Sequence, residues 1–156
     1  MENDTREKEM YAFFNVMKLN KINNINTDQL IMERLDYEQS SLQDGEIANN
    51  MGLSAEKMRS AQVLETLYRK LADPTLSEGQ RKAIEAEIDA EQQKSEAKKQ
   101  EFELKNQQLG MEENAIELQK KKLESVVTKL EKELDTIEEA EKTGIERANP
   151  KYNGLG

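Results

Sequence analysis

The residues of this chain that could do chemistry are limited in kind. Its 156 residues include no histidine and no cysteine, which excludes Ser-His-Asp triads, HExxH zinc sites, thiolate nucleophiles and disulfides. The adjacent carboxylates Glu138 and Glu139 remain, but general acid catalysis needs an environment that raises one carboxyl pKa, usually by burial. Nothing in the sequence around them predicts a pocket. We therefore expect no enzyme activity and no bound cofactor.

The acidic residues are equally poor candidates for a metal site. No segment has the D-x-D-x-D-G pattern of a calcium-binding loop. Carboxylates that are spaced along a straight helix do not converge on one ion, so the sequence predicts no metal site.

The balance of charge bears on the class of partner. The chain has 32 acidic and 23 basic residues and a formal net charge of -9, and such a field repels nucleic acid and anionic lipid surfaces. The one run of three basic residues, at positions 120–122, has Glu117 and Glu124 as neighbours and is typical of a solvated helix face. We predict no nucleic-acid binding, and we expect any charged partner to be basic.

The hydropathy pattern gives no targeting or membrane-spanning segment. The N-terminus lacks the basic region and the long apolar region of a cleaved signal peptide. No apolar run approaches the roughly 18 residues that a membrane helix needs. The expected location is either cytoplasmic or exported without a cleaved signal peptide, and the residues do not choose between the two.

Apolar residues recur every seven positions in the C-terminal half. The column consists of Phe102, Leu109, Ile116, Leu123, Leu130 and Ile137. Such spacing is how a helix presents one narrow seam to another helix. Val127 and Leu134 occupy the complementary heptad position, so the last part of the column forms a complete coiled-coil seam. Upstream, the complementary positions are polar, and a strict coiled coil there would gain little.

A second seven-residue column lies on the other side of the same predicted helix. Leu104, Met111 and Leu118 are about 200° around the helix from the first column, at 100° per residue. Between residues 102 and 118 the helix is therefore predicted to be apolar on opposite sides. A helix of this kind sits between two neighbours, which could be the N-terminal helices of the same chain, another subunit, or both.

The long C-terminal helix is predicted to cover about residues 78–143. Ser77 and Gln80 have the spacing of a capping box at its start, with Thr75 and Glu78 as an overlapping alternative. Gly144 and the Asn-Pro pair at 149–150 indicate its end. Residues 149–156 are expected to form a flexible tail.

Three shorter helices are predicted before it, at about 5–24, 28–44 and 54–72. The first has an apolar stripe of Met10, Phe13, Phe14 and Met17. Several asparagines weaken helix propensity near 23–27, and Ser54 is a candidate cap for the third helix. Gly45 and Gly52 mark either a loop or a weak point in one longer helix from 28 to 72. Asp73-Pro74 ends the last of these helices.

Together these elements predict an all-α fold, an elongated helical hairpin or coiled coil that forms a single domain over residues 1–148. The heptad position next to the seam is acidic almost throughout the long helix. Two copies paired antiparallel through this seam would set like charges against each other. In a parallel pair the balance is mixed, since Glu133 would meet Glu138 while Lys98 and Lys105 could help. A fold-back by the 54–72 helix, which carries Lys57, Arg59 and Arg69, fits this acidic edge better.

In general style the chain resembles small bacterial proteins of flagellar, type III secretion and phage assemblies, which often lack cysteine and pair a long C-terminal helix with shorter N-terminal ones. No specific motif carries this resemblance, so it assigns no functional residue. The sequence predicts a non-enzymatic structural or adaptor component of a protein assembly, which self-assembles or binds a helical, basic partner. The alternative is a helical chaperone or regulator that masks a partner's amphipathic helix. The predicted interaction residues are Phe102, Leu104, Leu109, Met111, Ile116, Leu118, Leu123, Val127, Leu130, Leu134 and Ile137.

Overall fold

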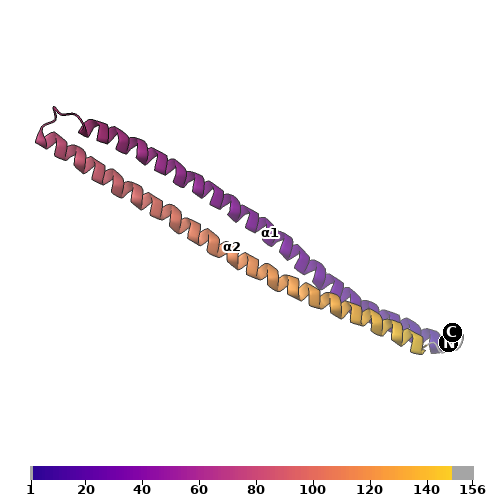
Figure 1. The fold of residues 1–156 in the computed structure, drawn as a ribbon. Coiled ribbons are helices and arrows are strands. Elements are labelled where there is room, and N and C mark those ends of the chain that lie inside the picture. The colour runs from indigo at the N-terminus through magenta and orange to yellow at the C-terminus, as the bar shows by residue number, and fades with distance from the viewer. Residues whose placement is uncertain (1, 149–156) are drawn as a thin grey trace. The chain divides into compact units, whose positions relative to one another are not determined.

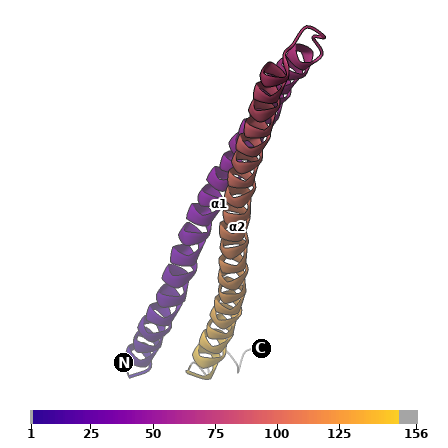
Figure 2. The same cartoon turned by 90° about the vertical axis from the view of Figure 1, so that its left-hand side faces the viewer.

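The chain folds into two long α-helices that pack against each other as an antiparallel hairpin in a computed structural model, which describes residues 2–148 (Figures 1 and 2). Helix α1 spans Glu2–Leu71 and helix α2 spans Glu78–Ala148. The described residues contain no β-strand. The prediction of an all-α helical hairpin is therefore confirmed, whereas the predicted tail at 149–156 lies outside the described residues.

The turn between the helices has the local chemistry that the sequence predicts. Helix α1 ends at Leu71, before the Asp73-Pro74 pair, and the carboxylate of Asp73 accepts hydrogen bonds from the backbone N–H (2.9 Å) and the hydroxyl (2.7 Å) of Thr75. These bonds lower the pKa of Asp73. At the start of α2, the Ser77 hydroxyl accepts from the Gln80 N–H at 3.1 Å, and the Gln80 side chain accepts from the Ser77 N–H at 3.0 Å. The capping box therefore uses Ser77 and Gln80.

The predicted break near 23–27 is wrong, because α1 is continuous through it. Of the two alternatives left open at Gly45 and Gly52, the single longer helix is the one found. The asparagines near 23–27 lie on the exposed side, while Ile25 among them is buried. Burial of an apolar side chain in a helical conformation outweighs a weak local preference. Ser54 lies inside α1 and is not a cap.

The glycines of the helices meet side chains of the opposite helix. A Cβ atom added at Gly52 would lie 2.7 Å from Cε1 of Phe102, and one at Gly45 would lie 3.7 Å from Cδ2 of Leu109. Gly52 is therefore not a helix break but the position where the Phe102 ring packs against the α1 backbone. Helix α2 also passes through Gly144, which faces Met10 and Phe14, so it ends later than predicted.

The chain divides into two compact units, each built from a segment of both helices. The terminal unit joins α1 up to Tyr37 with α2 from Ile116, and the turn unit comprises Glu38–Ala115. Among the described residues, those buried in the terminal unit are all apolar: Ile25, Leu35, Ile116, Val127 and Ile137. The turn unit buries two apolar residues, Leu67 and Ile88, and four polar ones, which are Asn49, Glu56, Ser60 and Ser95. The buried residues of the terminal unit are thus apolar, whereas most of those of the turn unit are polar.

Candidate interaction surfaces

Most of the predicted interaction residues pack inside the chain. The first column of α2 and its two complementary positions are buried or half-buried. Phe102 contacts Gly52 and Leu109 contacts Gly45 on α1 in the turn unit. In the terminal unit, Ile116, Val127 and Ile137 are each less than 10 % exposed. This seam is therefore occupied by α1 and is not available to a partner while the hairpin stays folded.

The second column of α2 faces solvent. In the turn unit, Leu104 is 57 % and Met111 72 % exposed, and in the terminal unit Leu118 is 55 % exposed. The prediction that α2 has apolar residues on opposite sides is thus confirmed. Helix α1 is the neighbour on one of these sides. No described residue of the chain covers the other side sufficiently to bury it. Leu104 and Met111 of the turn unit, called the outer column below, and separately Leu118 of the terminal unit are the parts of the predicted set that a partner could reach.

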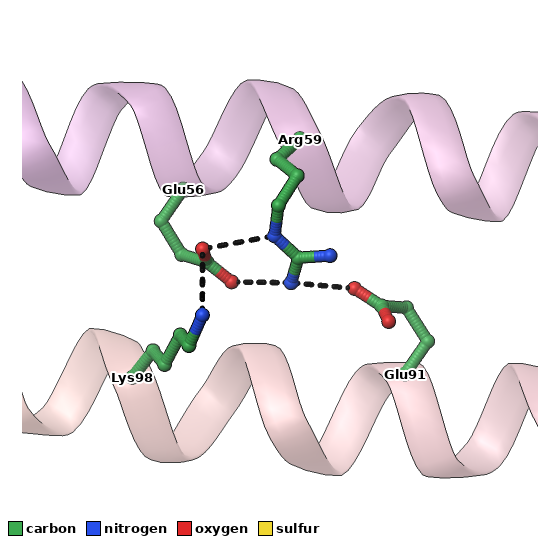
Figure 3. Close-up of polar contacts among 4 residues, drawn as sticks. All are labelled: Glu56, Arg59, Glu91 and Lys98. Carbon is green, nitrogen blue, oxygen red and sulfur yellow. Dashed lines mark hydrogen bonds and ion pairs between the residues drawn. The ribbon is translucent and has the colours of Figure 1, made fainter.

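A charged cluster lies between the helices of the turn unit (Figure 3). Glu56 of α1 is buried, with 7 % of its side chain exposed, and accepts two hydrogen bonds from the guanidinium of Arg59, at 2.6 Å and 3.0 Å. Arg59 also donates to Glu91 of α2 at 2.8 Å, and Lys98 of α2 lies 3.6 Å from Glu56. A buried carboxylate is tolerated only when it is paired and hydrogen-bonded in this way.

The cluster shifts the protonation equilibria of its members. Hydrogen bonds from Arg59, supported by the charges of Arg59 and Lys98, lower the pKa of Glu56 to about 2 despite its burial. The carboxylates of Glu56 and Glu91 in turn raise the pKa of Arg59. Glu56 and Arg59 therefore both stay charged at neutral pH. The cluster ties the two helices of the turn unit together.

Amide side chains form a second polar contact between the helices of the turn unit. The amide of buried Asn49 donates to the backbone carbonyl of Phe102 and to the side chain of Asn106, both at 2.7 Å. Asn106 in turn donates to Asn50 at 2.8 Å. Asn106 is one of the polar heptad positions of α2 that the sequence identified. The sequence did not identify Asn49 as its partner on α1, because no sequence pattern distinguishes an asparagine that faces the other helix from an exposed one.

Two carboxyl groups also meet across the helices of the turn unit. Hydrogen bonding to Glu113, together with partial burial and the charge of Glu113, raises the pKa of Glu46. Gln43 donates a hydrogen bond to the same Glu113 at 3.0 Å. The two carboxyl groups repel each other when both are ionised, which is one of the reasons that the pKa of Glu46 is raised.

Ion pairs between the helices accompany the apolar layers of the terminal unit. Lys18 pairs with Glu141 at 2.5 Å, and Lys21 pairs with Glu133 at 2.6 Å. Lys120, from the basic run in α2, lies 2.6 Å from Asp36, which raises the pKa of Lys120. The first lysine of the predicted solvated face is therefore used inside the hairpin.

The largest exposed apolar area was not identified from the sequence. Among the described residues, α1 exposes thirteen large apolar side chains, against four on α2. In the first predicted stripe, Met10 and Phe14 point toward α2, but Phe13 is 61 % exposed and Met17 36 %. The available signal was a second heptad register in α1, with Val16, Leu30 and other exposed residues seven or fourteen positions apart. It was obscured because apolar residues surround the helix on all sides.

The described residues contain no group of three or more side chains that could hold a metal ion. In the same part of the chain, no helix is both long and apolar enough to cross a membrane. Comparisons of the chain with protein-family models, with curated proteins and with solved structures found no significant match.

Proposed function

We propose that this protein is a non-enzymatic structural or adaptor component of a larger protein assembly, which acts through helix-helix packing. The observation that carries the proposal is the exposed apolar surface on the outward sides of both helices, beyond what their mutual packing uses. Contiguous exposed apolar side chains on a soluble helix typically mark an interaction surface. The outer column of α2 is the surface to test for partner contact, because its seven-residue spacing is that of a helix-packing seam.

The side chains of the outer column contribute little to the hairpin itself. Met111 is 72 % exposed, so a partner that covered it would gain apolar burial, at about 25 cal/mol per Å². The neighbouring Gln107 and Gln108 are exposed and uncharged. A helix from another protein could therefore pack on Met111 beside these glutamines without burying a charge of this chain there.

A photo-cross-linking residue in place of Met111 tests the proposal in the cells that make the protein. We expect a defined cross-linked product that contains a second polypeptide. Glu112 is the matched control position, because it is also exposed but turned about 100° around α2. Equal labelling from both positions, or no product from Met111, would reject the outer column as an interaction surface.

The alternative function is a helical chaperone or regulator that masks a partner's amphipathic helix. Exposed methionines favour it, since flexible thioether side chains adapt to varied partners. The chain exposes Met51, Met58 and Met111. One cross-linked partner at fixed stoichiometry would support the masking role. Filaments or rings in negative-stain images would support the structural role. If the partner is basic, binding should weaken steeply as salt is raised.

A further inference from the structure

Helix α1 has an outward surface without charge in the terminal unit. Between Met10 and Met32 the only charged residues are Lys18, Lys21 and Asp28. All three are half-buried, and the two lysines form the ion pairs with α2 described above. Every exposed residue of this stretch is uncharged, in a chain of which 35 % is charged.

The apolar residues of this surface follow a second heptad register. Val16, Asn23 and Leu30 are seven apart, as are Leu19 and Asn26 in the companion column, and Phe13 flanks them. These six residues are called the neutral face. Val16, Leu19 and Leu30 are 57–68 % exposed. Asn23 and Leu30 are two and five positions from buried Ile25, which places their column on the opposite side of α1. Leu19 and Asn26 are six and one positions from Ile25, so the companion column lies about 100–120° around the helix from it.

We propose that the neutral face pairs with the same face of a second copy of this chain, with the two α1 helices parallel. The distribution of charge on the chain favours a second copy as the partner of the neutral face. A net charge of -9 opposes self-association through most of the surface, but two neutral faces meet without repulsion. A basic or acidic partner would find no charge on this face to recognise.

The residue that follows the neutral face, Glu33, indicates the orientation, because the asparagines can pair in either one. In a parallel pair Asn23 lies opposite Asn23, and in the antiparallel pair described below it lies opposite Asn26; in both, each amide can donate and accept. An asparagine at a core position is the best-known way for a coiled coil to fix its register and a two-stranded state. In an antiparallel pair that set Leu19 against Leu30, the neighbouring layer would set the carboxylate of Glu33 against Val16.

The exposed apolar area is sufficient for a pair. Phe13, Val16, Leu19 and Leu30 of the neutral face, with Ile22 beside them, are 39–68 % exposed. At roughly 100 Å² each, they would remove about 500 Å² of apolar surface from water on each copy. The two copies together then reach about 1,000 Å², the size from which specific interfaces are found. Glu33 follows directly after this segment, so the parallel pairing ends there.

Single cysteines test the proposal, because the natural chain has none. We expect the wild-type chain to sediment as a dimer at micromolar concentration. Val16→Cys and Leu30→Cys should each form a disulfide-linked dimer at least tenfold faster than Asn24→Cys, which is exposed on α1 but turned about 100° from Asn23. A monomeric wild-type chain, equal rates at all three positions, or Leu19→Cys linking to Leu30→Cys while neither links to itself, would overturn the proposal.

A charge placed in the neutral face provides an independent test. Leu30→Asp should raise the dimer dissociation constant by at least about 100-fold, whereas Asn24→Asp should change it by less than about threefold. Circular dichroism should show unchanged helix content for both variants, because both positions are exposed. A Leu30→Asp chain that remains dimeric would reject the neutral face. Loss of cross-links from Met111 with an intact dimer would reject the proposed function and leave this inference standing.

Discussion

Charged and amide side chains occupy inward positions of the turn unit where a simple coiled coil would have leucine or valine. Asn49 is 5 % and Glu56 7 % exposed, and burying such groups is costly unless their partners are in place. The partners of Asn49 lie on α2, whereas Glu56 pairs with Arg59 of α1 and with Lys98 of α2. A shift of α1 along α2 would leave Asn49 unpaired and would separate Glu56 from Lys98 and Arg59 from Glu91. We infer that they fix which residues of the two helices face each other.

The pH dependence of unfolding should reflect Glu56. Its pKa is about 2 in the folded chain, below the value of about 4.3 for an unperturbed glutamate. The ionised carboxylate therefore stabilises the fold above about pH 4.3, and this contribution is lost as the pH falls toward 2. We expect Glu56→Gln to lower the melting temperature at pH 7 and to have a smaller effect at pH 2.5, as followed by circular dichroism.

Glu87 provides the control for this prediction, because it is exposed on α2. Glu87→Gln should leave the melting temperature nearly unchanged at both pH values. If Glu56→Gln behaved in the same way at pH 7, the cluster of Figure 3 would contribute nothing to the fold.

Glu46 should show the opposite effect. Its pKa is raised in the folded chain, mainly by the hydrogen bond to the carboxyl of Glu113, so the fold favours the protonated form and is destabilised when both groups are ionised. Glu46→Gln supplies a neutral donor at every pH. We expect a higher melting temperature at pH 7 and a smaller gain at pH 4. A decrease at pH 7 would show that the two carboxylates do not repel each other in the hairpin.

At the scale of the helix, the glycines differ in what they contact, and this decides the effect of replacing them. Gly110 has no atom within 4 Å of an added Cβ, whereas Gly52 has the Phe102 ring at 2.7 Å. Gly110→Ala should therefore stabilise α2 by about 1 kcal/mol. Gly52→Ala should destabilise the chain, because overpacking typically costs about 1–3 kcal/mol, at least as much as the helix-propensity gain. Urea unfolding curves of the two variants provide the measurement.

The double variant Gly52→Ala, Phe102→Leu tests the reason for this difference. A smaller side chain in place of Phe102 leaves room for the added methyl group. The two substitutions should consequently be non-additive, with Phe102→Leu costing less in the Gly52→Ala variant than in the wild-type chain. Strict additivity would mean that the Phe102 ring does not limit the side chain at position 52.

The start of α2 depends on a single reciprocal cap. Ser77→Ala removes the hydroxyl that accepts from the Gln80 N–H and should cost about 1 kcal/mol in the free energy of unfolding. Ser54→Ala is the matched control, because Ser54 lies within α1 and alanine is the better helix former. Urea unfolding should show a loss for the first variant and no loss for the second. Equal effects would contradict the capping role of Ser77.

At the scale of the whole molecule, α2 has one side that holds the hairpin together and one that does not. In the terminal unit Ile116 is 9 % exposed, while Leu118, two residues later, is 55 % exposed. Ile116→Ala should cost about 2–5 kcal/mol in the free energy of unfolding. Leu118→Ala should change it by less than about 0.5 kcal/mol. Comparable losses would mean that Leu118 is covered in solution, as it would be in a stable oligomer.

The inward positions of α2 were predictable because they follow a seven-residue spacing that few other patterns produce. The inward positions of α1 were not predictable, because α1 has apolar residues on every side and buries polar residues as well as apolar ones. Leu35 and Glu56 both point toward α2, although one is apolar and the other charged. Only the partner residue on α2 determines which side of α1 is covered.

The sequence by itself determined the helical class, the capping box at Ser77 and the end of α1 before Pro74, because each depends on the backbone chemistry of a few neighbouring residues. Only the tertiary structure decided that α1 continues through Gly52, that Glu56 is buried, and that the outer column and the neutral face remain exposed. Each of these depends on residues distant in the sequence: the Phe102 ring fills the space at Gly52, and Lys98 and Glu91 complete the charged cluster. Burial on α1 is a property of the packed pair of helices, and no local pattern in α1 contains it.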